Sequence, residues 1–289
     1  MVNKAIVVYL DNNDKMVIEF SWLWKTWKYH NLDDEFDLVV YYNPLVESKL
    51  NQFTDIKKIP MGVMGMGYEY KFLNSHYFCL DEWSVPLKKY EYIMKTDCDV
   101  FLTHNLKGYT PSKLLIGQGG YYDSTDELKI NFIKKVCRDN NINYQHLTNI
   151  GATFFGKTEI VLNIVKNQAI LTENILITYF KNNPTCVYSG FNIGISSMIA
   201  GEVVVNGFAN RQSIILYALD SKCWKTTKIG SDVLHIHAWH SFEKWSKHEF
   251  FDGLYSDWVV NYENRYESAA DYCHWVATND ILNINIERM

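Results

Sequence analysis

Two aspartates separated by one residue are the side chains best suited to chemistry in this sequence. Asp97 and Asp99 stand in the stretch YEYIMKTDCDVFLT, residues 90–103, with apolar residues on both sides. Those apolar residues predict two buried strands, and side chains at positions i and i+2 leave a strand end on the same side. Carboxylate oxygens held in this way are ligands for Mg²⁺ or Mn²⁺, which in turn bind diphosphates. The alternative is a solvated turn, because a D-x-D is expected by chance about once in a chain of this length.

Three histidines later in the chain could complete a metal site with these aspartates. Residues 231–241 read SDVLHIHAWHS and carry His235, His237 and His240. On a strand, His235 and His237 share one face. One imidazole beside two carboxylates gives an N/O site that suits Mn²⁺ or Mg²⁺, whereas zinc is disfavoured because no cysteines stand at ligand spacing. We predict His237 as the ligand because it is closer to the strand end; the alternative is one buried, hydrogen-bonded histidine and two exposed ones.

Two carboxylates are candidates for a general base. Glu202 is the lone charge in GFNIGISSMIAGEVVVN, residues 190–206, a run that predicts a loop followed by an apolar helix. A carboxylate in apolar surroundings either pairs with a cation or has a raised pKa, and both states can serve catalysis. Glu202 is therefore the first candidate, with Asp123 or Asp126 behind it. The structural alternative is a helix glutamate that pairs with a core Arg or Lys.

The first part of the chain predicts the elements that hold these groups. Buried parallel strands are predicted at 5–10, a continuous apolar run, and at 37–42, where an apolar run follows Asp37; residues 15–29 carry apolar side chains at helical spacing. With a short strand at 56–59, the order predicts a doubly wound sheet whose ligands lie beyond the carboxyl ends of its strands. The residues that we predict to contact a bound nucleotide donor are Tyr9, Leu10, Asp11, Tyr41, Lys71, Asp97, Gly151, Ala152 and Lys244.

Some of these positions have plainer alternatives. Gly151 and Ala152 belong to NIGATFFG, residues 149–156, which could form a floor under a sugar or a packed strand–helix junction. Lys71 could reach a diphosphate or stay solvated, and Lys244, with Lys247, could touch phosphates beside the histidines. The stretch MGVMGMGYEY at 61–70 lacks a phosphate-loop pattern, so we expect a flexible connection over the donor site.

Composition excludes several classes of protein. The formal net charge of −5 and the lack of a basic block argue against a nucleic-acid partner. The 9 Trp, 20 Tyr and 15 Phe predict an ordered core and aromatic faces for sugar rings. We find no secretory signal pattern, no apolar run long enough to span a bilayer and no C-x-x-C spacing among the six cysteines. We therefore expect a cytoplasmic protein with reduced thiols and no membrane span.

A single domain over residues 1–289 is the simplest organisation, because no linker rich in Pro, Gly or Ser interrupts the chain. Residues 1–103 would form a nucleotide-binding half, and 104–289 an acceptor half that ends in an aromatic helical tail. Further helices are predicted at 71–83, 124–139, 157–171 and within 256–277, and further strands at 114–116 and 149–156. The predicted fold class is α/β, with a mixed, mainly parallel central sheet flanked by helices.

In this order, the features resemble those of GT-A (Rossmann-like) glycosyltransferases. NIGATFFGKTEIV resembles the segment that follows the D-x-D in blood-group-type galactosyltransferases and lines the donor and acceptor sugars. The late histidine resembles the third metal ligand of glycogenin-like enzymes. The resemblance implies that Asp99 and His237 bind metal, that Asp97 holds metal, ribose or sugar, and that Glu202 lies near a catalytic or acceptor-binding carboxylate.

The resemblance also implies an activity. A metal-dependent enzyme of this kind moves a sugar from a nucleotide sugar, with UDP-xylose, UDP-glucose or UDP-galactose favoured, to an oligosaccharide or glycan acceptor; we lean towards inversion. Lys95 and Thr96 depart from the apolar residues that precede the acidic pair in many relatives. A soluble, unanchored transferase also resembles those that large algal DNA viruses use to build capsid glycans, although no motif carries that likeness.

Two other functions stay open at this level. Asp97-Cys98-Asp99-Val100 fits the D-x-D-x-[TV] pattern of haloacid-dehalogenase-like phosphatases, in which Asp97 would be the nucleophile. The late position of the motif and the lack of a G-D-x-x-x-D argue against this class. The third possibility is a catalytically inactive sugar-binding protein that uses the Trp- and Tyr-rich tail.

Overall fold

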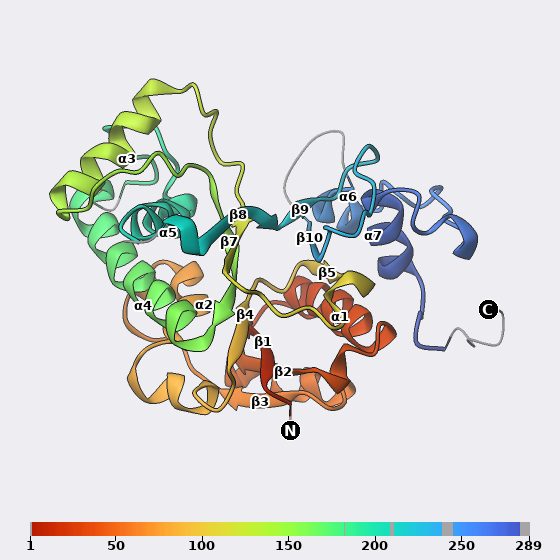
Figure 1. The fold of residues 1–289 in the computed structure, drawn as a ribbon. Helices are drawn as coiled ribbons and strands as arrows, with labels where there is room; N and C mark the ends of the chain where they lie inside the picture. The colour runs from red at the N-terminus through yellow and green to blue at the C-terminus, as the bar shows by residue number, and fades with distance from the viewer. Residues whose placement is uncertain (1, 182, 209–210, 239–244, 284–289) are drawn as a thin grey trace.

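A seven-stranded sheet forms the centre of the computed structural model, which describes residues 2–181, 183–208, 211–238 and 245–283 (Figure 1). The strand order is β3-β2-β1-β4-β7-β6-β8. In this sheet β7 alone runs opposite to the other strands, since it pairs antiparallel with both β4 and β6 while the remaining pairs are parallel. The predicted mixed, mainly parallel α/β fold is therefore confirmed. The strands are β1 (Lys4–Leu10), β2 (Phe36–Tyr42), β3 (Lys57–Pro60), β4 (Tyr92–Lys95), β6 (Leu114–Gln118), β7 (Ile150–Lys157) and β8 (Ile214–Leu219).

Strand β1 shows why the apolar runs form central strands. All seven of its residues are buried. Its side chains alternate between two cores. Ile6 and Val8 belong to the core that contains Phe20 of α1 (Asp14–Tyr29), whereas Val7 belongs to the core that contains Val161 of α4 (Thr158–Ile175). A strand covered on both faces needs apolar residues at every position, and the run AIVVYL has them.

Helices cover both faces of the sheet, with α2 to α5 on one side and α1 on the other, whereas α6 and α7 lie beyond α1, beside the short strands β9 (Ser221–Lys222) and β10 (His235–His237) (Figure 1). Helix α1 begins after Asn13, whose side chain accepts a hydrogen bond from the Lys15 N–H, and this cap starts the helix where the sequence predicts. The helices are α1 (Asp14–Tyr29), α2 (Asn74–Tyr77), α3 (Glu127–Asp139), α4 (Thr158–Ile175), α5 (Ser196–Asn206), α6 (Lys247–Phe251) and α7 (Ala269–Thr278).

The segment between β3 and β4 differs from its prediction. Instead of one helix over 71–83, the chain forms a short 3-10 turn, the single-turn helix α2 and a second 3-10 segment that contains Pro86. Tertiary contacts hold this irregular path: the Tyr70 hydroxyl donates to the Gly194 carbonyl, and the Asn74 side chain donates to the Gly67 carbonyl. In the tail, the helix predicted within 256–277 is the ten-residue α7, and a 3-10 turn at Tyr262–Asn264 precedes it.

The two predicted halves share a core. Leu10, Phe20 and Leu38 from the first half pack in one cluster with Leu219 and Leu234 from the second. The C-terminal tail is anchored through a second cluster, in which Trp22 of α1 and Trp275 of α7 are both buried. The predicted packing of the tail on the sheet domain is thus explained by aromatic side chains.

One helix is long and apolar enough to cross a membrane by length and composition alone. The helical stretch from Thr158 to Phe180 has a window of mean hydropathy 1.2, and 56% of that window is buried within the protein. Its apolar residues, such as Val161 and Val165, pack in the core beside β1. The burial accounts for its apolar composition.

Candidate metal centre

Asp97, Asp99 and His237 lie together, with one ligand atom from each within 4.8 Å of the others. The aspartates occupy the bend between β4 and β5 (Val100–Leu102), and His237 ends β10 (His235–His237). Strands β5 and β10 form a second, three-stranded sheet with β9 (Ser221–Lys222), in the order β5-β10-β9.

The pairing of β5 with β10 explains why residues so distant in sequence meet. The two strands are antiparallel, and His237 is the partner of Val100, directly after the D-x-D. The backbone N–H of Ala238 also donates to the Asp99 carbonyl at 2.9 Å. The structure therefore brings together all three residues that the sequence predicts as a metal site.

Asp99 lies between two cationic groups. The Lys247 Nζ atom lies 2.8 Å from Oδ2 of Asp99, and the His237 Nε2 atom lies 3.2 Å from Oδ1. Burial by itself would raise the pKa of Asp99, but Lys247 and His237 hold that pKa well below its usual range. Lys247 also lies 3.1 Å from Oε1 of Glu19, where burial, followed by the charge of Asp99, raises the pKa of the carboxyl to about 7. Asp99 is therefore ionised and available as a ligand at neutral pH.

His237 is flanked by a carboxylate on each side. Its Nδ1 atom lies 3.3 Å from Oδ1 of Asp220, opposite the contact of Nε2 with Asp99. Burial would lower the pKa of this histidine, but the two carboxylates raise it well above the usual value. A divalent cation that binds Nε2 would take the place of the proton on that nitrogen.

Asp97 is the more accessible of the two aspartates. Its side chain is 34% exposed, against 10% for Asp99. The Lys95 Nζ atom lies 3.3 Å from Oδ1 of Asp97 and donates to the Ala152 carbonyl at 3.0 Å, although Lys95 itself is fully buried. The basic residue that departs from the resemblance thus supplies a buried positive charge beside the D-x-D.

The donor set fits a hard divalent cation. Two carboxylates and one imidazole, half-buried at a strand end, match the N/O ligands of Mn²⁺ and Mg²⁺, and no cysteine belongs to the described cluster. Lys95 and Lys247 add positive charge at its two sides. Such a site can hold a metal ion and a diphosphate together.

The end of β1 carries a polar group with no described partner. Tyr9 is only 4% exposed, and its hydroxyl has no hydrogen-bond partner among the described residues. Burial, with the nearby charge of Asp11, raises its pKa, so the group is a neutral donor. Asn43 fixes the strand end beside it, since its backbone N–H donates to the Leu10 carbonyl and its side chain to Asp11. An orphaned hydroxyl here is a ready contact for a nucleotide.

Other predicted donor contacts lie elsewhere or have other partners. Tyr41 is fully buried, its hydroxyl donates to the Trp83 carbonyl at 2.6 Å, and its ring stacks on Phe78, so the structure gives it a packing role. Lys71 is exposed. Lys244, like His240, lies outside the described residues.

Gly151 leaves room for the carboxylate of Asp220. A Cβ atom at this position would lie 2.3 Å from Oδ2 of Asp220, so only glycine admits the carboxylate. Ala152 acts through its backbone carbonyl, which accepts from Lys95. These two residues line the space between the D-x-D and β8.

The predicted bases lie outside the described metal cluster. Glu202 accepts hydrogen bonds from the hydroxyls of Tyr121 and Tyr122 and from the Asn149 N–H, and burial raises its pKa to about 7. Of the two states expected for this glutamate, burial among these neutral donors favours the raised pKa. Asp123 is exposed and accepts from the backbone and hydroxyl of Thr125, which lower its pKa.

Sequence reasoning missed Asp220 and its partners. Asp220 is fully buried and accepts hydrogen bonds from the side chain and backbone of Thr153. The signal was present: Asp220 follows the apolar run of β8, as Asp97 follows that of β4. An acidic residue at the end of an apolar strand supports the same interpretation in both places.

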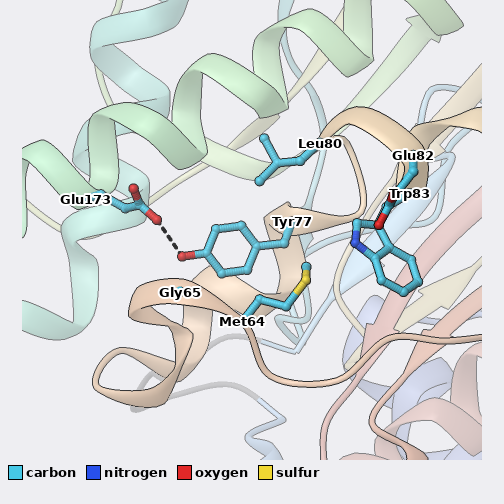
Figure 2. A pocket seen from close by; sticks show the side chains of 7 residues that line it. All are labelled: Met64, Gly65, Tyr77, Leu80, Glu82, Trp83 and Glu173. Atoms are coloured by element: carbon cyan, nitrogen blue, oxygen red, sulfur yellow. Dashed lines mark hydrogen bonds between the residues drawn. The ribbon is translucent and has the colours of Figure 1, made fainter.

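A cavity of about 360 Å³ opens beside the irregular segment, apart from the metal cluster (Figure 2). Inside it, the Tyr77 hydroxyl donates to Glu173 at 2.6 Å, so the segment before β4 is tied to α4 rather than free. The lining residues are Met64, Gly65, Tyr77, Leu80, Glu82, Trp83 and Glu173.

Comparison with known proteins gives a family for this chain and a distant similarity to solved structures. Residues 64–288 match the model of a family described as "Domain of unknown function (DUF7164)", and no curated protein matches the chain. The structure is similar to that of the galactosyltransferase LgtC in complex with donor and acceptor sugar analogues, with 11% identity, a TM-score of 0.48, and coverage of 91% of this chain and 99% of that one. It is also similar to the apo structure of the bifunctional glycosyltransferase WbbM, with 11% identity, a TM-score of 0.45, and coverage of 84% of this chain and 46% of that one. At 11% identity, neither likeness assigns a role to a residue of this chain.

Proposed function

The chain belongs to the DUF7164 family, whose description states no activity, and we propose from its site that it is a metal-dependent glycosyltransferase. It would move a sugar from a nucleotide-sugar donor, most simply a UDP-sugar, to a carbohydrate acceptor. The observation that supports this function is the meeting of Asp97, Asp99 and His237 within 4.8 Å at the end of β4. Ligands of α/β sheets bind at the carboxyl ends of the strands, where this cluster lies.

Asp97, Asp99 and His237 would hold Mn²⁺ or Mg²⁺. Such an ion, when bound, neutralises charge on a leaving nucleoside diphosphate. Lys247 keeps Asp99 ionised, and Lys95 places a second positive charge beside Asp97. The Tyr9 hydroxyl, buried and unpaired in the described structure, would donate to the nucleoside from the end of β1.

An inverting transfer also needs a group that takes the proton of the acceptor hydroxyl. We propose Glu202 for this role, because burial raises its pKa to about 7, near the value at which a general base works best at neutral pH. Asp123 is the weaker candidate, since its pKa is lowered. Glu202→Gln should then lower kcat far more than it changes KM.

All six cysteines are buried thiols rather than disulfides, which supports a reducing compartment, and we propose the cytoplasm. The side chain of Asp97 is 34% exposed, so its carboxylate could also attack a phosphate ester, which is the reaction of the alternative phosphatase. Both reactions must therefore be measured on the same preparation.

The experiment is a panel of nucleotide sugars with Mn²⁺ and mixed oligosaccharide acceptors, followed by detection of the released nucleoside diphosphate and of the extended glycan. We expect one donor to give both products, and EDTA to stop the reaction. Phosphate release from simple phosphoesters without any acceptor would favour a phosphatase. Sugar binding without turnover of any donor would favour a sugar-binding protein.

A further inference from the structure

Asp220 is one member of a closed ring of hydrogen bonds that lies next to the candidate metal site. Asp220 follows β8, is fully buried and adopts a left-handed backbone with φ of +57°. Its Oδ1 atom accepts from the Thr153 hydroxyl at 2.6 Å, and its Oδ2 atom accepts from the Thr153 N–H at 3.2 Å. A buried carboxylate with this many donors is held in one orientation.

Two glycines leave the space that this carboxylate occupies. A Cβ atom at Gly117 would lie 1.7 Å from Oδ2 of Asp220, and one at Gly151 would lie 2.3 Å from the same atom. Either contact is far shorter than packed atoms allow. The backbones of β6 and β7 therefore form a cradle that fits the Asp220 side chain and excludes other positions for it.

Each group in the ring donates a hydrogen bond to the next group, in the same direction around the ring. The backbone N–H of Asp220 donates to Nδ1 of His235 at 3.2 Å, so the proton of a neutral His235 lies on Nε2. Nε2 is 2.8 Å from the Thr96 hydroxyl, which it donates to. Thr96 in turn lies 2.9 Å from the Thr153 hydroxyl, whose own proton goes to Asp220, so Thr96 must donate to Thr153.

The ring joins residues in or next to four strands, and each member is fixed by the next. Thr96 follows β4, Thr153 belongs to β7, Asp220 follows β8 and His235 begins β10. Thr96, with 1% of its surface exposed, is the least buried of the four. In such a dry network, hydrogen bonds reinforce one another and leave little freedom of orientation.

We propose that Asp220 is a positioning residue of the metal centre, which holds the Nδ1 side of His237 so that Nε2 faces Asp99 and a bound divalent cation. The two distances that carry this are 3.3 Å from Nδ1 of His237 to Oδ1 of Asp220 and 3.2 Å from Nε2 to Oδ1 of Asp99. Histidine ligands in metal sites donate their second N–H to a carboxylate, which fixes the ring and strengthens the ligand. The inference rests on the proposed function, because it assumes that the cluster binds metal.

The test is the affinity for Mn²⁺ of the full chain, measured by calorimetry and by electron paramagnetic resonance. Asp220→Asn should weaken binding by about 10- to 100-fold, the usual effect of removing such a partner. Asp232→Asn, an exposed change in the loop before β10, is the matched control and should leave the affinity unchanged. If the wild type binds Mn²⁺ and Asp220→Asn binds it equally well, the inference is wrong while the metal site stands. If the wild type itself does not bind Mn²⁺, the proposed function fails first.

Two further measurements keep the inference open to contradiction if Asp220→Asn does not fold. Thr153→Val removes the hydroxyl that orients Asp220 and should weaken Mn²⁺ binding several-fold; unchanged affinity would overturn the inference. Long-range ¹H–¹⁵N NMR of the Mg²⁺-loaded wild type should show the His237 proton on Nδ1, and a proton on Nε2 would overturn it as well. If the role of Asp220 were purely structural, Asp220→Asn would lower the metal-free melting temperature without changing the affinity for Mn²⁺ or the tautomer of His237.

Discussion

The Nε2 atom of His237 lies 3.2 Å from the Oδ1 atom of Asp99, at the junction of the two sheets. Asp99 leaves the large sheet after β4, and His237 ends a strand of the small sheet. Their contact depends on the antiparallel register that pairs His237 with Val100. The candidate metal site is therefore built by the small sheet, and changes that disturb β5 or β10 will act on it even when they spare the ligands.

Substitution of Lys247 tests whether its positive charge stabilises the neighbouring carboxylates of Asp99 and Glu19. Lys247→Met removes the cation that lies between Asp99 and Glu19, which leaves two carboxyls facing each other in a buried place. Breaking a buried ion pair in this way costs about 3–5 kcal/mol, less here because Glu19 can take up a proton. We expect a lower metal-free melting temperature, with partial recovery in Glu19→Gln/Lys247→Met. The control is Lys113→Met, at an exposed position; equal melting temperatures for the two lysine variants would contradict this account.

Substitution of Tyr9 distinguishes a role of its hydroxyl in ligand binding from a role in packing. Tyr9→Phe removes a buried hydroxyl that has no described partner, so the nucleotide-free protein should be as stable as the wild type or slightly more stable. Affinity for the nucleoside diphosphate should fall about fivefold, the value of one hydrogen bond near 1 kcal/mol. Calorimetric titration measures the affinity, and thermal melting measures the stability. A loss of stability with unchanged affinity would give Tyr9 a structural role only.

Gly151 tests the cradle under Asp220. In Gly151→Ala the new Cβ would lie 2.3 Å from the Asp220 carboxylate and 2.7 Å from a backbone carbon of Gly117, so the carboxylate or the backbone of β6 must shift. We expect a loss of about 1–3 kcal/mol in the free energy of unfolding from overpacking, together with weaker Mn²⁺ binding. Gly62→Ala is the matched control, because a methyl group at that position would have no neighbouring atom within 4 Å. If the two variants unfold at the same denaturant concentration, the cradle is looser than its geometry indicates.

Glu202 gives the stability of the protein a pH dependence. Its pKa in the folded protein is about 7, above its ordinary value of 4.5, so the folded state binds more protons between these values. The free energy of unfolding must then fall as the pH rises from 4.5 to 7, by up to about 3 kcal/mol from this residue. Glu19 has the same direction and adds to the slope. Glu202→Gln should flatten the curve in urea titrations over this range; an unchanged slope would mean that Glu202 is ionised throughout.

The sequence predicted the sheet and the metal cluster because both depend on local patterns. Buried strands such as β1 need continuous apolar runs, and the position of Asp97 and Asp99 at a strand end is visible as a break in such a run. The choice of His237 over His235 rested on its place nearer the strand end, and the register of β5 and β10 puts it beside Asp99.

The parts that escaped prediction depend on contacts between distant residues. No local pattern reveals that Asp220 sits against Gly117 and Gly151, since this requires β6, β7 and β8 to be neighbours. The irregular path over 71–83 is set in the same way, by the hydrogen bond of Tyr70 to a carbonyl in the loop before α5. Local propensity for a helix is weak, and tertiary contacts override it.

The most direct test of the central claim is a calorimetric titration of UDP into the protein with and without Mn²⁺. We expect binding with one site that requires Mn²⁺, is lost in Asp99→Asn and His237→Gln, and persists in Asp232→Asn. Tight binding of UDP that ignores Mn²⁺ and survives the loss of Asp99 would contradict a metal site at these residues. Failure to bind UDP, followed by failure with the other nucleoside diphosphates, would contradict the glycosyltransferase itself.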